Sequence, residues 1–186
     1  FIDTYHRSGL YPMKMPAVLG LEAAGVVEAL GDGVTRFKAG DRIAYNGTPG
    51  AYAEAAVVPA DRAVRVPDGV SLETAAAVLL KGMTAEFLVR RCHKVEPGQT
   101  ILVHAAAGGV GSILVQWAKA LGATVIATVG SEAKAALARD HGADHVILYR
   151  QEDVASRVAA ITGGQGVAVV YDGVGKDTFE ASLNSL

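Results

Sequence analysis

The residues best suited to chemistry in this chain are small ones in a glycine-rich turn, Ala106, Gly108 and Gly111. They follow an apolar run and have the spacing of the G-x-G-x-x-G fingerprint, with alanine in the first position. In that fingerprint the first small residue permits a tight turn, the second lets the backbone approach a pyrophosphate, and the third lets helix and strand pack closely. Free N–H groups at the start of the following helix would bind the anion. The turn therefore predicts binding of a dinucleotide.

The sequence around the turn decides between this interpretation and a purely structural turn. Apolar residues recur at helical spacing after it, and Gly122 stands where a glycine would end that helix. Residues 124–129 then form a second apolar run, typical of a buried strand. The periodic residues are Val110, Ile113, Leu114, Trp117, Ala118 and Leu121. A strand, turn, helix and strand in this order favour the dinucleotide interpretation.

Strands and helices alternate over the second part of the chain. We expect a parallel, doubly wound sheet, because strands recur about every 20 to 24 residues between amphipathic helices. Before it, Ser71 is a plausible N-cap for a helix over residues 72–80, and a second helix is expected over residues 83–93. The expected strands lie near 100–104, 124–129, 144–149 and 167–171, and the helices near 109–121, 131–140, 151–161 and 176–185.

The first 66 residues or so have a different pattern. Short alternating runs cover residues 22–30, 40–45 and 51–58, and glycine-containing turns separate them. Such a pattern is typical of a compact β-rich domain. Residues 66–71 mark the change, since Pro67 and the Asp-Gly pair after it interrupt regular structure.

Composition describes a globular chain without an obvious polymeric partner. The 186 residues are 51% hydrophobic and 19% charged, with a net charge of −2. This charge gives no reason to expect nucleic acid, and we interpret the basic cluster at residues 90–94 as a solvated helix end. No apolar run approaches the ~18 residues of a membrane span. The lone Cys92 indicates a reducing compartment, so we expect a cytoplasmic protein.

Several segments together resemble a known family. They resemble the quinone oxidoreductases, the zinc-free, zeta-crystallin-like branch of the medium-chain dehydrogenase/reductase superfamily. The segments are residues 1–12, 20–27, 38–42, 104–123 and 170–175. The resemblance implies a partial GroES-like β-rich domain over residues 1–76 and a partial Rossmann doubly wound parallel sheet over residues 77–186. It also implies NADPH in the cleft between the domains, and hydride transfer to a quinone or a related electron-poor alkene or enone.

Both ends of the chain depart from the family pattern. The chain begins without Met, and it stops after about four of the six strands that a full Rossmann sheet has. We therefore expect an internal fragment whose activity belongs to the parent protein. Relatives carry dimer contacts in the missing last strands, so the resemblance implies a homodimeric parent.

The sequence does not predict a metal site. Zinc alcohol dehydrogenases resemble this chain but have a Gly-His-Glu block, which here reads Gly20-Leu21-Glu22, and leucine cannot bind zinc. One cysteine cannot form a structural zinc site, which requires four. The five histidines show no ligand spacing, and we expect surface or capping roles for them. They are His6, His93, His104, His141 and His145.

The end of the second Rossmann strand bears on the choice of cofactor. An NAD site has an acid there, but the strand ends at Gly130 and Ser131, and Glu132 is expected in the first turn of the next helix. Sequence alone leaves Lys134 open between a solvated helix lysine and a phosphate ligand. The resemblance implies that Gly130, Ser131, Lys134 and Tyr149 contact the adenosine phosphate, which favours NADPH.

The resemblance also implies the rest of the site. Tyr5 would donate a hydrogen bond or proton to the oxygen of the reduced acceptor; the alternative is that its ring only packs beside the nicotinamide. Phe87 would line the site or be a core residue. The remaining residues implied at the cofactor or acceptor are Phe1, Ile2, Asp3 and Thr4, together with Ala106, Gly108, Gly109, Val110 and Gly111 of the turn.

Two other functions stay open. One is an enoyl-thioester reductase, which would use the same hydride chemistry. The other is a crystallin-like or RNA-binding protein that binds NADPH without useful turnover. The sequence has no nucleophile elbow, Ser-His-Asp order or paired carboxylates that would indicate a hydrolase.

Overall fold

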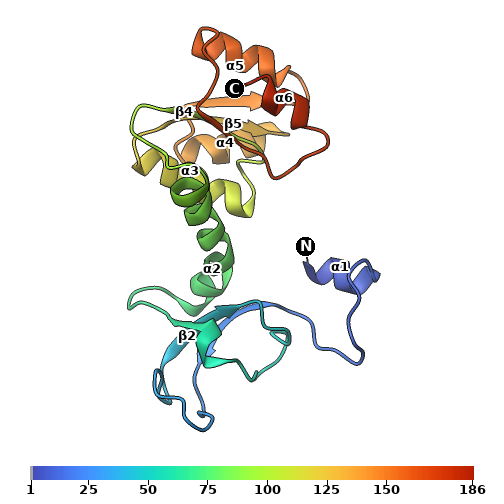
Figure 1. The fold of residues 1–186 in the computed structure, drawn as a ribbon, viewed down its shortest axis with the longest axis vertical. Helices are drawn as coiled ribbons and strands as arrows, with labels where there is room; N and C mark the ends of the chain where they lie inside the picture. Colours follow the sequence, from blue (N-terminus) through green and yellow to red (C-terminus); the bar gives the residue numbers. More distant parts are fainter. Residues whose placement is uncertain (1) are drawn as a thin grey trace. The chain divides into compact units, whose positions relative to one another are not determined.

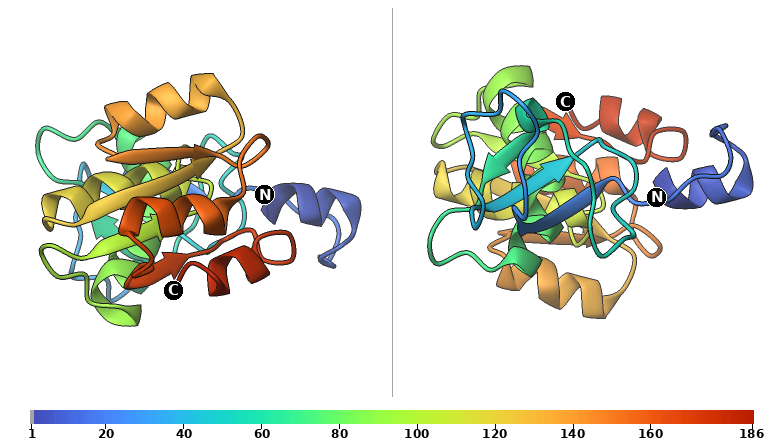
Figure 2. Two further views of the ribbon diagram at one scale, coloured as in Figure 1. Left: turned by 90° about the horizontal axis from the view of Figure 1, so that it is seen from above. Right: turned by 90° about the horizontal axis from the view of Figure 1, so that it is seen from below.

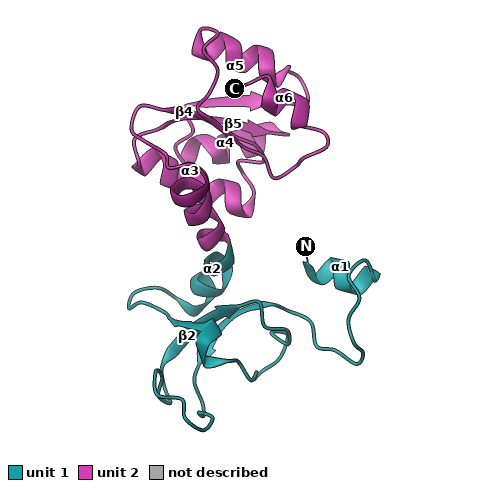
Figure 3. Ribbon diagram, in the orientation of Figure 1, with its two compact units in different colours: residues 1–80 teal, residues 81–186 magenta. Residues whose placement is uncertain are grey.

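The computed structural model describes residues 2–186, which form two compact units. Unit 1 ends at Leu80 and unit 2 runs from Lys81 to Leu186, so that the boundary falls within helix α2, Leu72–Phe87 (Figure 3). The sequence predicts two helices here, but the structure has one, because Gly82 lies within the helix and does not interrupt it. A single glycine lowers helix stability by only about 1 kcal/mol.

Unit 1 contains a three-stranded antiparallel sheet. Its strands are β1 (Glu22–Val26), β2 (Arg42–Asn46) and β3 (Ala63–Arg65), in the order β1-β2-β3. Helix α1 (Ile2–Ser8) and the short 3₁₀ helix η1 (Ala60–Arg62) complete the unit with the start of α2. Ser71 caps α2 as expected, since its Oγ accepts the Thr74 N–H at 3.0 Å.

The prediction of a strand over residues 51–58 is wrong. Within the part of the chain that the structure describes, these residues join no sheet, and Val57 is 96% exposed. Four of the eight residues are alanines, which have little preference for strands, and a strand needs a partner that supplies its hydrogen bonds. The third strand is β3, which pairs with β2 from Ile43 to Tyr45.

Unit 2 contains the expected parallel, doubly wound sheet. Its strands β4 (Thr100–Val103), β5 (Thr124–Val129), β6 (His145–Leu148) and β7 (Val169–Tyr171) pair in the order β6-β5-β4-β7. The helices that connect or follow them are α3 (Gly109–Ala120), α4 (Glu132–Asp140), α5 (Val154–Thr162) and α6 (Phe179–Leu183). Helices α3 and α4 cover one face of the sheet, and α5 and α6 cover the other (Figure 1).

Each face of this sheet packs into its own core. Ile101 and Val125 point to the side of α3 and α4, whereas Leu102 and Ile126 point to the side of α5 and α6. The strands lie side by side between these layers (Figure 2). Because both faces of the sheet are covered, the sequences of its strands are continuous apolar runs and do not alternate between apolar and polar residues.

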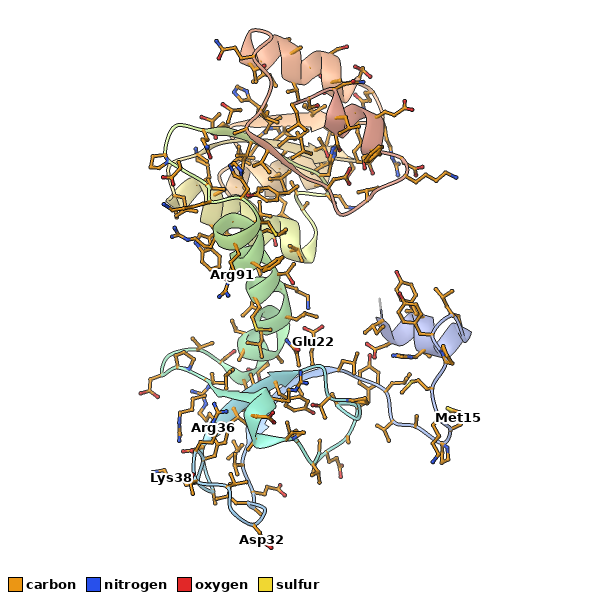
Figure 4. The ribbon with its side chains drawn as sticks, viewed as in Figure 1. Met15, Glu22, Asp32, Arg36, Lys38 and Arg91 are labelled. Atoms are coloured by element: carbon orange, nitrogen blue, oxygen red, sulfur yellow. The ribbon has the colours of Figure 1, made fainter. Side chains whose placement is uncertain are left out.

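Helix α2 continues into a π-helical turn, η2 (Leu88–Cys92). The Tyr171 hydroxyl donates to the carbonyl oxygens of Leu88 (3.3 Å) and His93 (3.5 Å), and burial raises the pKa of Tyr171 to about 12. Arg91 forms an ion pair with Glu86 at the surface of this turn, where Figure 4 labels it. The basic cluster therefore does lie at a helix end.

None of the helices within residues 2–186 combines the length and the apolar character needed to cross a bilayer.

Candidate functional site

The glycine-rich turn connects β4 to α3, and its glycines are there for steric reasons. A Cβ on Gly111 would overlap the Ala105 carbonyl oxygen and lie 2.8 Å from Ala106 Cα. One on Gly108 would lie 3.0 Å from the same oxygen, which accepts the Gly108 N–H at 2.8 Å. Ala106 is fully buried. The close approach of helix and strand at this turn therefore requires small residues.

The residue that takes up the turn's unusual backbone conformation is Ala105. Its φ of +49° lies in the left-handed region, which non-glycine residues rarely adopt. The fingerprint predicts the tight turn at Ala106, the next residue, which is wrong. The N–H of Ala106 instead donates to the Thr128 carbonyl on β5, at 3.2 Å.

The start of α3 offers N–H groups to an anion. Gly108 is the N-cap, and the Ser112 N–H bonds back to the Gly108 carbonyl at 2.9 Å. This is the first hydrogen bond of the helix, so the helix provides no acceptor for the N–H groups of Gly109, Val110 and Gly111, which come before Ser112. Gly108 and Gly109 are also exposed. This backbone fits the pyrophosphate expected from the fingerprint.

A cavity of about 420 Å³ lies at the carboxyl ends of the unit 2 strands. In doubly wound sheets ligands bind at this edge, where the strand order changes direction, here between β4 and β7. All its lining residues belong to unit 2: Ala105, Ala107, Gly108, Thr128, Val129, Gly130, Lys134, Tyr149, Glu152, Asp153, Val154, Val174, Asp177, Thr178 and Ala181.

The residues expected at an adenosine phosphate come together around Gly130. Lys134 and Tyr149 line the cavity with it, and a Cβ on Gly130 would lie 2.6 Å from the Tyr149 hydroxyl. Ser131 is the N-cap of α4 and accepts the Lys134 N–H at 3.4 Å. Glu132 lies in the first turn of α4, as expected.

Three carboxylates line the cavity that were not expected from the sequence, those of Glu152, Asp153 and Asp177. Glu152 accepts the Leu148 N–H at 3.0 Å and forms an ion pair with Arg157 at 2.7 Å. Asp153 is the N-cap of α5, and hydrogen bonds from Ser156 hold its pKa below its usual range. An acid before an apolar helical run is a capping signal, which could have identified Asp153.

Other residues expected at the cofactor lie in α1 and α2. Asp3 accepts the Gly20 N–H at 3.0 Å, and the Tyr5 ring meets the Tyr11 ring edge-on at a centroid distance of 5.4 Å. Ile2 and Thr4 lie in α1 with them, and Phe1 lies outside the described residues. Phe87 is the last residue of α2 and is half exposed.

His104 is not the surface or capping residue that the sequence analysis expects. It directly follows β4 and is 5% exposed. Its Nδ1 lies 2.9 Å from Thr128 Oγ1, and its Nε2 lies 3.2 Å from Ser182 Oγ. Partners on β5 and α6 satisfy both ring nitrogens, and nothing in the local sequence indicates them.

Over residues 2–186, no three His, Cys, Asp or Glu side chains gather in a way that could hold a metal ion.

Two family models match this chain. One, described as alcohol dehydrogenase GroES-like domain, matches residues 1–68, and the other, described as zinc-binding dehydrogenase, matches residues 109–186. With the fold, they define the class of protein: a GroES-like antiparallel sheet followed by a Rossmann-type parallel sheet, as in the alcohol dehydrogenases.

Individual relatives narrow the class. A quinone oxidoreductase of Pseudomonas aeruginosa is 56% identical over 99% of this chain and 57% of its own length. A 2-haloacrylate reductase of a Burkholderia species is 49% identical over 100% of this chain and 58% of its own. The crystal structure of Escherichia coli quinone oxidoreductase complexed with NADPH matches with a TM-score of 0.95 and 52% identity, covering 100% of this chain and 58% of that one. The chain belongs to the quinone oxidoreductase family of the medium-chain dehydrogenase/reductase superfamily, and it spans a little over half the length of these relatives.

Proposed function

We propose that the protein is an NADPH-dependent oxidoreductase that transfers hydride to a quinone or a related electron-poor alkene. The cavity beside the glycine-rich turn carries this proposal, because it combines a backbone suited to a pyrophosphate with Lys134 and Tyr149. The E. coli relative binds NADPH, and the Burkholderia relative is named for an alkene substrate.

In this proposal the chain's own residues bind and orient the cofactor, which supplies the hydride when bound. The N–H groups of Gly109, Val110 and Gly111 hold the pyrophosphate. Lys134 and Tyr149 hold the adenosine phosphate, with Gly130 leaving room for it. The second Rossmann strand, β5, ends without the acid that an NAD site uses, and the nearby Glu152 is already paired with Arg157.

The test is a Lys134→Ala variant of the full-length protein. It removes a charge-assisted contact of about 1.5–3 kcal/mol, which is roughly ten- to hundredfold in NADPH affinity, while NADH affinity changes little. Lys94→Ala, at an exposed lysine paired with Glu96, is the matched control. Titration calorimetry measures both cofactors, and an equal loss for NADPH and NADH would disprove the phosphate assignment.

Tyr5 is our proposed donor to the acceptor oxygen. Hydride arriving at an electron-poor ring or alkene leaves negative charge on that oxygen, and a phenolic O–H can stabilise or protonate it. Tyr5→Phe should lower kcat by at least about 10²-fold, with NADPH affinity nearly unchanged. Tyr11→Phe alters the neighbouring ring and serves as the control. Turnover of Tyr5→Phe close to that of the Tyr11 variant would leave Tyr5 with a packing role only.

The substrate that accepts the hydride can be identified by comparing rates of turnover. NADPH oxidation is measured with quinones, alkenals, haloacrylates and enoyl-thioesters. We expect quinones or simple activated alkenes to give the highest kcat/KM; a preference for thioesters would indicate an enoyl-thioester reductase instead. Because the family resemblance implies a homodimer, we also expect two copies per particle in analytical ultracentrifugation.

A further inference from the structure

A chain of hydrogen bonds runs through the buried side of the glycine-rich turn. Asp172 accepts from Ser182 Oγ at 2.7 Å, so that the Ser182 oxygen is left to accept from His104 Nε2 at 3.2 Å. His104 Nδ1 then accepts from Thr128 Oγ1 at 2.9 Å. His104, Thr128 and Ser182 are all buried. Each ring nitrogen of His104 has one hydroxyl partner, and the Ser182 hydroxyl lies between two, since it donates to Asp172 and accepts from His104.

The protonation states of Asp172 and His104 agree with the donor and acceptor roles in this chain of hydrogen bonds. Burial lowers the pKa of His104, and the Asp172 carboxylate opposes that shift only in part. Burial by itself would raise the pKa of Asp172, but hydrogen bonds from Ser182, Gly175, Thr178 and Val174 outweigh it and hold the pKa below its usual range. A neutral imidazole and an ionised carboxylate are therefore the expected states at neutral pH.

The left-handed residue Ala105 lies between two residues that are bonded to the neighbouring strands. On one side of Ala105, the His104 N–H donates to the Tyr171 carbonyl on β7 at 3.0 Å, while the His104 ring meets Thr128. On the other side, the Ala106 N–H donates to the Thr128 carbonyl. A left-handed conformation at a non-glycine residue is unfavourable and persists only where its surroundings determine it. Here β5 and β7 determine it from both sides.

Asp172 also holds the loop after β7, which lines the same cavity. Its Oδ1 accepts the N–H groups of Val174 and Gly175, each at 2.9 Å, and both its oxygens accept from Thr178 Oγ1. Val174 and Thr178 line the cavity together with Ala105, Ala107 and Gly108 of the turn. One carboxylate therefore holds this loop and, through Ser182 and His104, the turn itself.

We propose that His104 and Asp172 are positioning residues that hold Ala105 in its left-handed conformation and so keep the N–H groups of the turn ready for the cofactor's pyrophosphate. The proposal rests on the proposed function, since it concerns the same cavity. It adds that the affinity for the cofactor depends on a buried imidazole which the cofactor does not touch.

The test compares two substitutions of His104 in the full-length protein. His104→Leu removes both side-chain bonds, whereas His104→Gln keeps one donor and one acceptor on a side chain of similar length. We expect His104→Leu to raise the NADPH dissociation constant and KM by about tenfold or more, because small displacements of a binding group weaken its contacts. We expect kcat at saturating NADPH to stay within about twofold, and His104→Gln to recover most of the affinity.

A matched control separates positioning from stability. Ser185 is also buried, follows α6, and donates to the Ala181 carbonyl at 2.7 Å, but it is not bonded to Asp172. Ser185→Ala should lower the thermal midpoint without changing the NADPH dissociation constant. If His104→Leu also lowers only the midpoint, the chain of hydrogen bonds is merely structural and the proposal is wrong.

A milder variant covers the case in which His104→Leu does not fold. Ser182→Ala breaks the link between the imidazole and the carboxylate and leaves both in place. It should raise the NADPH dissociation constant several-fold relative to Ser185→Ala, and an unchanged value would overturn the proposal. A wild-type protein that does not bind NADPH would instead disprove the proposed function.

Discussion

The parallel sheet of unit 2 buries every residue of β5 except Thr124, whereas the antiparallel sheet of unit 1 leaves the residues of β1 part-buried or exposed. Unit 2 has layers of helices on both faces of its sheet. The core of unit 1 is a small cluster around Ala44, Val66 and Ala75. Substitutions should therefore have large effects where the backbone and side chains are enclosed, as at the cavity, and small effects in the unit 1 sheet.

The largest difference is expected between two apolar strand residues. Ile126 on β5 is fully buried, and Ile126→Ala should lower the free energy of unfolding by about 2–5 kcal/mol through lost burial and the cavity that remains. Val26 on β1 is 53% exposed, and Val26→Ala should change it by less than about 0.5 kcal/mol. Urea denaturation measures both, and equal losses would contradict the contrast between the sheets.

Two glycines give the next contrast. Gly111→Ala places a Cβ against the Ala105 carbonyl and should destabilise unit 2 by about 1–3 kcal/mol while weakening NADPH binding. Gly25 lies within β1, and a Cβ there would meet nothing within 4 Å. Gly25→Ala should be neutral or slightly stabilising, because glycine weakens strand interiors. Thermal unfolding with and without NADPH separates the effects on stability and on binding.

One carboxylate from each unit should contribute to the loss of stability at low pH. The pKa values of Asp172 and Asp41 are both lowered. For Asp41 the main cause is the hydrogen bond from the Lys38 N–H, and the hydrogen bond and charge of Arg65 add to it, while partial burial acts in the opposite direction. The folded form of each therefore binds fewer protons than the unfolded one. Their contribution to stability is complete above the unfolded pKa of about 3.9 and is lost as pH falls through the lower folded pKa.

Asn variants test this sign. Asp172→Asn and Asp41→Asn should each flatten the decline in the free energy of unfolding below about pH 4, measured by denaturation at a series of pH values. The change should be larger for Asp172, whose carboxylate accepts from four groups. A steeper decline in either variant would contradict the direction of the shift.

The smallest difference is expected between two helix caps. Ser71 caps α2 with a 3.0 Å bond to the Thr74 N–H, and Ser131 caps α4 with a longer one of 3.4 Å. Ser71→Ala should lower the free energy of unfolding by about 1 kcal/mol, and Ser131→Ala by less. Circular dichroism during urea denaturation measures both, and the reverse order would show that the cap distances do not determine stability here.

Sequence patterns predict unit 2 better than unit 1, for a physical reason. The bounds of β5 agree at both ends, and Gly122 follows α3 with a φ of +85°, as its C′ position requires. Both follow from local rules of burial and capping. Residues 51–58 also alternate locally, but a strand depends on a partner that the alternation does not specify.

The candidate site divides in the same way. The small residues of the turn are adjacent in sequence to the strand and helix that position them, so their spacing predicts them. The sequence alone leaves Lys134 of α4 open, and only the family resemblance favours it as a phosphate ligand. The roles of His104 and Ala105 depend on Thr128, Ser182 and Tyr171, which are distant in sequence. No local pattern encodes such bonds, and they are found only after the strands are placed next to one another.

The π-helical turn η2 has a consequence for sequence alignment. A π-helical turn holds one residue more than an α-helical turn of the same length. It is therefore equivalent to a single-residue insertion into a regular helix. A homologue that lacks this residue would continue α2 as an ordinary helix and rotate the residue equivalent to His93 by about 100°. The His93 carbonyl would then turn away from Tyr171, whose hydroxyl would lose one of its two acceptors and keep only the Leu88 carbonyl. We therefore expect single-residue gaps near residues 88–92 to coincide with replacement of Tyr171 by a residue without a hydroxyl.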